Sequence, residues 1–181
     1  MKVRKLLSRS FCERNNAMKT KKLATAAVLT ATAMILSYVE SLIPAFVAIP
    51  GIKVGLANIV TVFALYTIGW RGAICVSLVR VCLSSLLFGN VTGFFYSLSG
   101  ALLSFVGMVI VKQIRIFSPI GVSTVGGVLH NVGQIFASAL VLETAAVFTY
   151  LPVLFVSGTV AGVVIGAAAG LLAKRLENIV K

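Results

Sequence analysis

Aspartate is absent from this chain of 181 residues, and its acidic side chains are limited to four glutamates, Glu13, Glu40, Glu143 and Glu177. The lack of aspartate excludes a Ser-His-Asp triad. A zincin motif needs two histidines, and His130 is the only one. The chain also lacks a Walker motif of the form GxxxxGKS or GxxxxGKT, so it cannot energise transport with ATP unaided. We therefore expect no catalytic residues and no enzymatic activity.

Cysteine is also scarce, because Cys12, Cys75 and Cys82 form neither an even set nor a CxxC pair. Their number and spacing imply no disulfide framework and no zinc site. A lone histidine with no cysteine, aspartate or second histidine nearby is a poor set of metal ligands. We expect no metal site and no other cofactor.

Apolar residues are abundant instead: they make up 59% of the chain, and the mean hydropathy is +1.07. Soluble domains contain roughly 45 to 50% apolar residues, so this composition indicates an integral membrane protein. The apolar runs are about 20 residues long and do not alternate with polar residues, which predicts helices and not barrel strands. We expect an all-α integral membrane protein with six transmembrane helices, at about 23–43, 54–69, 73–88, 91–111, 121–142 and 152–172.

The net charge of +12 does not indicate nucleic-acid binding, since the cations lie at the ends of apolar runs and form no face with interleaved aromatics. Cytoplasmic loops of membrane proteins gather lysine and arginine. With both termini in the cytoplasm, fourteen of the sixteen cations fall inside, Lys53 falls outside, and Arg80 falls within the membrane. This pattern predicts a multi-pass protein of the cell membrane, with a basic N-terminal segment at 1–22, a six-helix domain at 23–173 and a basic tail at 174–181.

The stretch PGIKVGLANIV, residues 50–60, is a polar and glycine-marked interruption in the apolar first half. Pro50 and Gly51 are expected to end the preceding helix. Lys53 then lies outside, and Asn58 lies about one turn inside the next helix. Two interpretations fit: a lip that holds an anion or a polar ring, or an ordinary extracellular turn with a snorkelling lysine.

Arg80 lies near the middle of the predicted helix 73–88, where inserting an arginine costs about 2.5 to 3.5 kcal/mol. Ser77 and Ser84 share its face of the helix, and such polar stripes turn inward in membrane bundles. The guanidinium either binds an anion or a carbonyl group of a ligand, or pairs with helix-end carbonyls or a glutamate.

The predicted helix 121–142 carries His130, Asn131 and Gln134. Hydrogen bonds within the bundle and hydrogen bonds to a ligand both fit these side chains. Aromatic residues, Tyr96 among them, gather toward the outer helix ends. They form either an aromatic belt at the membrane surface or the lining of an outward pocket.

Small residues mark two helices for close packing. Ala27 and Ala31 form an AxxxA pattern on the first helix, which either packs inside this bundle or docks a second membrane subunit. The last helix contains an uninterrupted GxxxGxxxGxxxG, at Gly158, Gly162, Gly166 and Gly170. This ridge predicts contact with another helix, which belongs either to this chain or to another.

PGIKVGLAN (50–58), SLSGALLS (97–104), GGVLHNVGQ (126–134) and the small-residue first helix together resemble the Gx transporter family, over about residues 21–174. That family is often labelled heptaprenyl diphosphate synthase component I. It is similar to the substrate-binding S components of energy-coupling factor (ECF) vitamin transporters.

The resemblance implies a six-helix, S-component-like bundle that binds a small cofactor-type molecule from outside, with the first loop as a lid. It also implies that an AxxxA face, matched here by Ala27 and Ala31, meets a transmembrane coupling subunit that partners two ATPases. Prenyl diphosphate synthases use Asp-rich motifs to hold magnesium on diphosphate. Because this chain has no aspartate, the synthase label does not imply catalysis.

We therefore expect a substrate-capture subunit for a vitamin or cofactor precursor, in contact with the lipid bilayer, a coupling subunit and ATPase subunits. The candidate substrate contacts are the polar residues described above: Lys53, Asn58, Arg80, Tyr96, His130, Asn131 and Gln134. The alternative is a non-catalytic membrane accessory protein in isoprenoid, quinone or flavin handling, in which the same residues only tie helices together. A self-contained secondary transporter fits less well, because it would usually need carboxylates inside the membrane.

Overall fold

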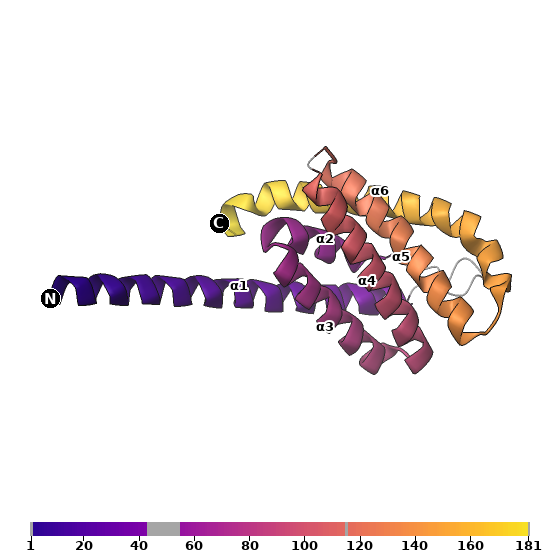
Figure 1. Ribbon diagram of the computed structural model, residues 1–181, viewed down its shortest axis with the longest axis horizontal. Helices are drawn as coiled ribbons and strands as arrows, with labels where there is room; N and C mark the ends of the chain where they lie inside the picture. The colour runs from indigo at the N-terminus through magenta and orange to yellow at the C-terminus, as the bar shows by residue number, and fades with distance from the viewer. Residues whose placement is uncertain (1, 43–54, 115, 181) are drawn as a thin grey trace.

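The structure, a computed structural model, describes residues 2–42, 55–114 and 116–180, and the side chains of 19–42, 55–114 and 116–175. These residues form helices and no strand. The helices are α1 (Lys2–Leu42), α2 (Asn58–Thr67), α3 (Trp70–Phe88), α4 (Val91–Gln113), α5 (Pro119–Val141), the 3-10 helix η1 (Ala145–Tyr150) and α6 (Leu151–Val180). Figure 1 shows their arrangement, with the N-terminal end of α1 and the C-terminal end of α6 at the same end of the molecule.

Five segments of these helices are long and apolar enough to cross a membrane: Lys19–Leu42, α3, α4, α5 and Ala145–Arg175. The chain is thus a multi-pass helical membrane protein. Of the six transmembrane helices predicted, the one expected at about 54–69 contains α2, which has only 10 residues and is shorter than a span. At 1.5 Å per residue, α2 extends about 15 Å, half of a hydrocarbon core about 30 Å thick.

Glycines flank α2 on both sides, and they explain why it is shorter than predicted from hydropathy. Gly55 has a φ of +77° and Gly69 a φ of +83°, in the left-handed region that side chains with a Cβ rarely adopt. Hydropathy continues smoothly through both positions. The helical backbone does not continue through them, so the apolar run 54–69 contains only a short central helix.

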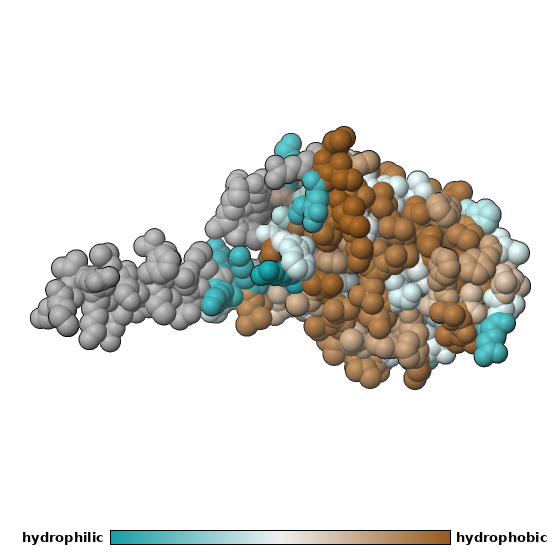
Figure 2. All heavy atoms as spheres, viewed as in Figure 1, coloured by the Kyte–Doolittle hydropathy of each residue, from teal (hydrophilic) through white to brown (hydrophobic). Residues whose placement is uncertain are grey.

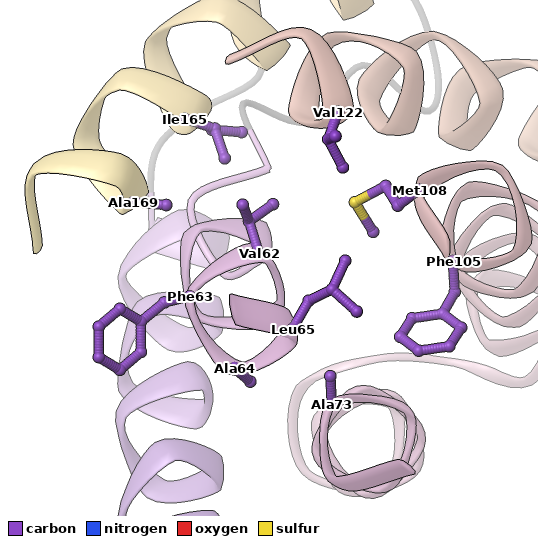
Figure 3. Close-up of a cluster of buried hydrophobic side chains, with 10 residues drawn as sticks. All are labelled: Val62, Phe63, Ala64, Leu65, Ala73, Phe105, Met108, Val122, Ile165 and Ala169. Carbon is purple, nitrogen blue, oxygen red and sulfur yellow. The ribbon is translucent and has the colours of Figure 1, made fainter. Parts of the chain in front are cut away.

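The helix α2 lies at the centre of the molecule, and all of its residues from Val60 to Leu65 are buried. Figure 3 shows the core cluster that it forms with side chains of α3, α4, α5 and α6, including Ala73, Met108 and Ile165. A short apolar helix of this kind is typical of a buried core.

The helices α4, α5 and α6 make the most extensive contacts in the described structure. The glycine ridge of α6 packs against α5: a Cβ on Gly162 would lie 2.5 Å from the Thr124 Cα, and one on Gly166 would lie 2.6 Å from the Ile120 Cα. The second helix on the ridge therefore belongs to this chain. The helices α1, α2 and α3 pack beside this glycine-rich trio.

The surface of the bundle is strongly apolar, as expected for contact with lipid. Side chains such as Leu86, Val106 and Leu140 are exposed on α3, α4 and α5. Figure 2 shows a broad hydrophobic surface facing the viewer, with hydrophilic residues toward the two ends of the molecule. This distribution matches a bilayer whose polar boundaries lie at those ends.

Candidate functional site

A cavity of about 620 Å³ lies between the α1–α3 helices and the α4–α6 helices. Its lining includes the last turns of α1, α3 and α5 and the first turns of α4, together with part of η1. The cavity is therefore at the end of the bundle where the chain passes from α3 to α4 and from α5 to α6. Its volume falls within the roughly 300 to 1,000 Å³ typical of sites for small molecules.

Among the described residues, the short α2 helix leaves space at this end of the bundle. Asn58, the first residue of α2, lines the cavity, so α2 extends from the cavity toward the opposite end of the bundle. The neighbouring helices α1 and α3 continue alongside the cavity, with Ser37 of α1 and Ser84 of α3 in its lining. Because α2 begins only at Asn58, the described residues leave space between α1 and α3 beyond that end of α2.

Arg80 lines the cavity from the middle of α3. Its Nη2 donates a hydrogen bond to Asn58 Oδ1 at 3.4 Å. Its Nε is buried and has no hydrogen-bond partner among the residues that the structure describes. A buried donor without an acceptor is costly. Arg80 also lines the cavity, so a ligand there can accept hydrogen bonds from its guanidinium group.

Glu40, near the end of α1, lines the same cavity and accepts a hydrogen bond from the backbone N–H of Gly55. The Gly55 carbonyl in turn accepts the backbone N–H of Asn58 at 2.8 Å. Together with the contact between Asn58 and Arg80, these hydrogen bonds link α1, the start of α2 and α3. The cavity therefore contains one cationic and one anionic side chain from different helices.

Close packing of α4 on α5 positions the other polar residues. Ser99 Oγ donates to the Gly133 carbonyl at 2.8 Å. A Cβ on Gly100 would lie 2.8 Å from the His130 carbonyl oxygen and 2.9 Å from the Gln134 Cγ. The segments 97–104 and 126–134 therefore contact each other, and this contact brings His130 and Gln134 to the cavity.

Aromatic rings form part of the wall. Phe88, Tyr96 and Tyr150 line the cavity from α3, α4 and η1. The Tyr38 and Phe88 rings are in contact, with centroids 5.1 Å apart. Some outer aromatic rings thus line the cavity, while Phe95 is exposed on the outer surface, as expected for an aromatic belt.

Five of the seven predicted contacts meet at this cavity: Asn58, Arg80, Tyr96, His130 and Gln134. Asn131 is not among its lining residues. Its amide donates to the Leu154 carbonyl at 2.8 Å and to Ser157 Oγ at 3.3 Å, so it ties α5 to α6. The seventh residue, Lys53, lies outside the described residues, as does most of the stretch expected to form the lip.

Glu40 is a charged residue of the cavity that the sequence analysis did not single out. A signal was present, because Glu40 is the only acidic residue within the first apolar run. Ionisable side chains in such runs usually face a cavity or a partner.

Ala27 and Ala31 are exposed on α1, while Ala33, Ala26 and Leu29 of the same helix face the bundle. The AxxxA stripe is therefore not used for packing within the described part of the chain.

These helices and their cavity define a multi-pass membrane component with space for a small molecule. The family model for heptaprenyl diphosphate synthase component I matches residues 29–172, so the chain belongs to that family, the Gx transporter family of S-component-like membrane proteins. A comparison with curated proteins gave no match, and a comparison with solved structures gave none either.

Proposed function

We propose that this protein is the substrate-binding membrane subunit of an ECF-type transporter, and that it captures a vitamin or cofactor precursor from the outer face of the cell membrane. The observation that carries the proposal is the cavity, which is large enough for such a molecule and is lined by both polar and aromatic side chains. Membership of an S-component-like family supports the same function.

Binding would combine two contributions. Burial of an apolar or ring-shaped body against Phe88, Tyr96 and Tyr150 supplies most of the free energy, while the polar groups of Arg80 and Gln134 fix the orientation. The protein itself has a binding and not a catalytic function. Hydrolysis of ATP belongs to partner subunits.

Mass spectrometry of the purified full-length chain tests this function. A small molecule bound in near-stoichiometric amount should be released on denaturation and identified. Thr92→Trp, which places a large ring in the cavity wall, should abolish retention of that molecule. The matched variant Thr159→Trp introduces the same ring at an exposed position of α6 and should retain it. Equal retention by both variants, or no retained molecule in the parent protein, would contradict the proposal.

The coupling subunit is proposed to dock on α1 at Ala27 and Ala31, because both are small and exposed. The double variant Ala27→Leu/Ala31→Leu should lose the transmembrane coupling subunit and the ATPases during purification from native membranes. Thr32→Leu, at an exposed position of α1 beside the stripe, serves as the control. Persistence of the complex in the double variant would remove this docking face.

A further inference from the structure

The hydrogen-bond donors of Arg80 exceed the acceptors around it. A guanidinium group carries five N–H donors in a planar fork. The Nη2 contact with Asn58 Oδ1 is long, at 3.4 Å, and the buried Nε finds no acceptor within the described part of the chain. Arg80 lines the cavity, so an acceptor placed there would satisfy guanidinium donors that the described residues leave open.

The charges in the cavity narrow the chemistry of that acceptor. Among the described residues that line it, Arg80 is the only arginine or lysine and Glu40 is the only acid. The Glu40 carboxylate already accepts the Gly55 N–H from its own chain. A ligand that brought two negative charges would face one guanidinium and one carboxylate. Because Arg80 and Glu40 attract each other and their charges cancel, a ligand with one negative charge leaves a net charge of −1 in the cavity, and one with two leaves −2.

We infer that the molecule bound in this cavity carries a carboxylate, which the Arg80 guanidinium holds through paired N–H···O hydrogen bonds. A carboxylate presents two oxygens in the plane and spacing that the fork of an arginine matches. Phosphate groups would match the fork as well, but they carry nearly two negative charges at neutral pH. The inference rests on the proposed function and specifies the class of its substrate.

The remainder of this acid faces a mixed wall. Phe88, Tyr96 and Tyr150 provide aromatic surface, and hydroxyl groups such as those of Ser84 and Ser138 also line the cavity. The substrate class is therefore a small organic acid with an apolar or aromatic body and a few polar substituents. A highly charged nucleotide or polyphosphate does not fit this wall.

A small-molecule extract of cells is the probe for the first experiment. The purified full-length protein is equilibrated with the extract, washed, and denatured, and the released compounds are identified by mass spectrometry. Compounds enriched by the parent protein should contain a carboxyl group and no phosphate. The affinity of the recovered acid and of its primary amide is then measured by calorimetry, and the acid should bind at least about tenfold more tightly.

Three variants test whether Arg80 causes the preference for the acid over its amide. Arg80→Gln should weaken binding of the recovered acid by about tenfold to a hundredfold, the range expected when a charge-assisted hydrogen bond is lost. Arg80→Lys keeps the charge but not the fork, so it should recover only part of the affinity. The matched control Arg71→Gln makes the same change at an exposed position outside the cavity and should leave binding unchanged.

The outcomes separate this inference from the proposed function. If the parent protein enriches no compound, the proposed function itself fails. If it enriches a neutral, cationic or phosphorylated compound, or if the amide binds as well as the acid, only the carboxylate inference is overturned. Equal binding by the parent and a folded Arg80→Gln protein, with folding checked by its thermal transition, also overturns it. Should Arg80→Gln not fold, Arg80→Lys decides, because unchanged affinity there excludes recognition by the fork.

Discussion

Gly127 of α5 and Gly158 of α6 pack backbone against backbone. A Cβ placed on Gly127 would lie 2.4 Å from the Gly158 carbonyl oxygen, and one placed on Gly158 would lie 2.9 Å from the Gly127 carbonyl oxygen. Neither backbone can move aside without separating the two helices. This contact holds α5 in the position from which His130 and Gln134 reach the cavity.

Gly127→Ala should destabilise the protein by about 1 to 3 kcal/mol, because the added methyl group overpacks a contact between backbones. The measurement is thermal unfolding in detergent. Gly170→Ala is the control on the same glycine ridge of α6, since a Cβ there would meet its nearest atom at 3.6 Å, an ordinary contact. Equal thermal transitions for the two variants would contradict the packing described here.

Asn131→Leu should destabilise the protein without weakening ligand binding. The variant loses the hydrogen bonds to Leu154 and Ser157, and it leaves the Leu154 carbonyl without the amide donor. The Leu154 carbonyl keeps the Ser157 hydroxyl as a donor at 3.1 Å, so a loss of about 0.5 to 1.5 kcal/mol is expected for each hydrogen bond removed. Unfolding and ligand affinity are measured on the same preparation. A large fall in affinity with unchanged stability would return Asn131 to the binding site.

Lys112→Met should loosen the C-terminal end of α2. The Lys112 ammonium donates to the Leu65 carbonyl at 2.5 Å and lies 4.4 Å from the centre of the Tyr66 ring. Methionine keeps most of the apolar stem but removes both interactions, which should cost about 1 to 3 kcal/mol.

Hydrogen exchange at the Ile68 amide, which donates to the Ala64 carbonyl at the end of α2, reports this loosening. Exchange should become faster in Lys112→Met. It should not change in Lys174→Met, where the replaced lysine is exposed on α6. Identical exchange in both variants would show that Lys112 does not stabilise α2.

Glu40→Gln should maintain or raise the affinity for a carboxylate ligand, by up to about tenfold, or 1.4 kcal/mol. The change removes a negative charge from the cavity, while the glutamine oxygen can still accept the Gly55 N–H. Calorimetry with the recovered acid provides the measurement, and Glu143→Gln, an exposed glutamate outside the cavity lining, is the control. A fall comparable to that of Arg80→Gln would instead indicate a cationic group of the ligand at Glu40.

Several residues of the cavity lining were predictable, because an ionisable or polar side chain in an apolar run is seldom exposed to lipid. Arg80 and Gln134 had to face the bundle interior or a cavity, since lipid would leave them unsatisfied. Asn131 also avoids lipid, but it does so by donating hydrogen bonds to α6 and not by lining the cavity. The sequence does not distinguish a side chain that lines the cavity from one that bonds to a neighbouring helix. Neighbouring residues of a helix point in different directions, and which direction meets the cavity depends on how the helices pack.

Composition and local pattern predict that this is a membrane protein. They also predict the approximate positions of five long helices and the packing of the glycine ridge against another helix. Transfer of a residue into lipid has a free energy that depends mainly on its own side chain, so runs of such residues identify spans without knowledge of their neighbours. Three features do not follow in this way: the short length of α2, the packing of the glycine ridge against α5, and the position of Glu40, Asn58 and Arg80 at one cavity. They depend on backbone turns at Gly55 and Gly69 and on packing between helices far apart in the chain, whose energies exist only once the bundle has formed.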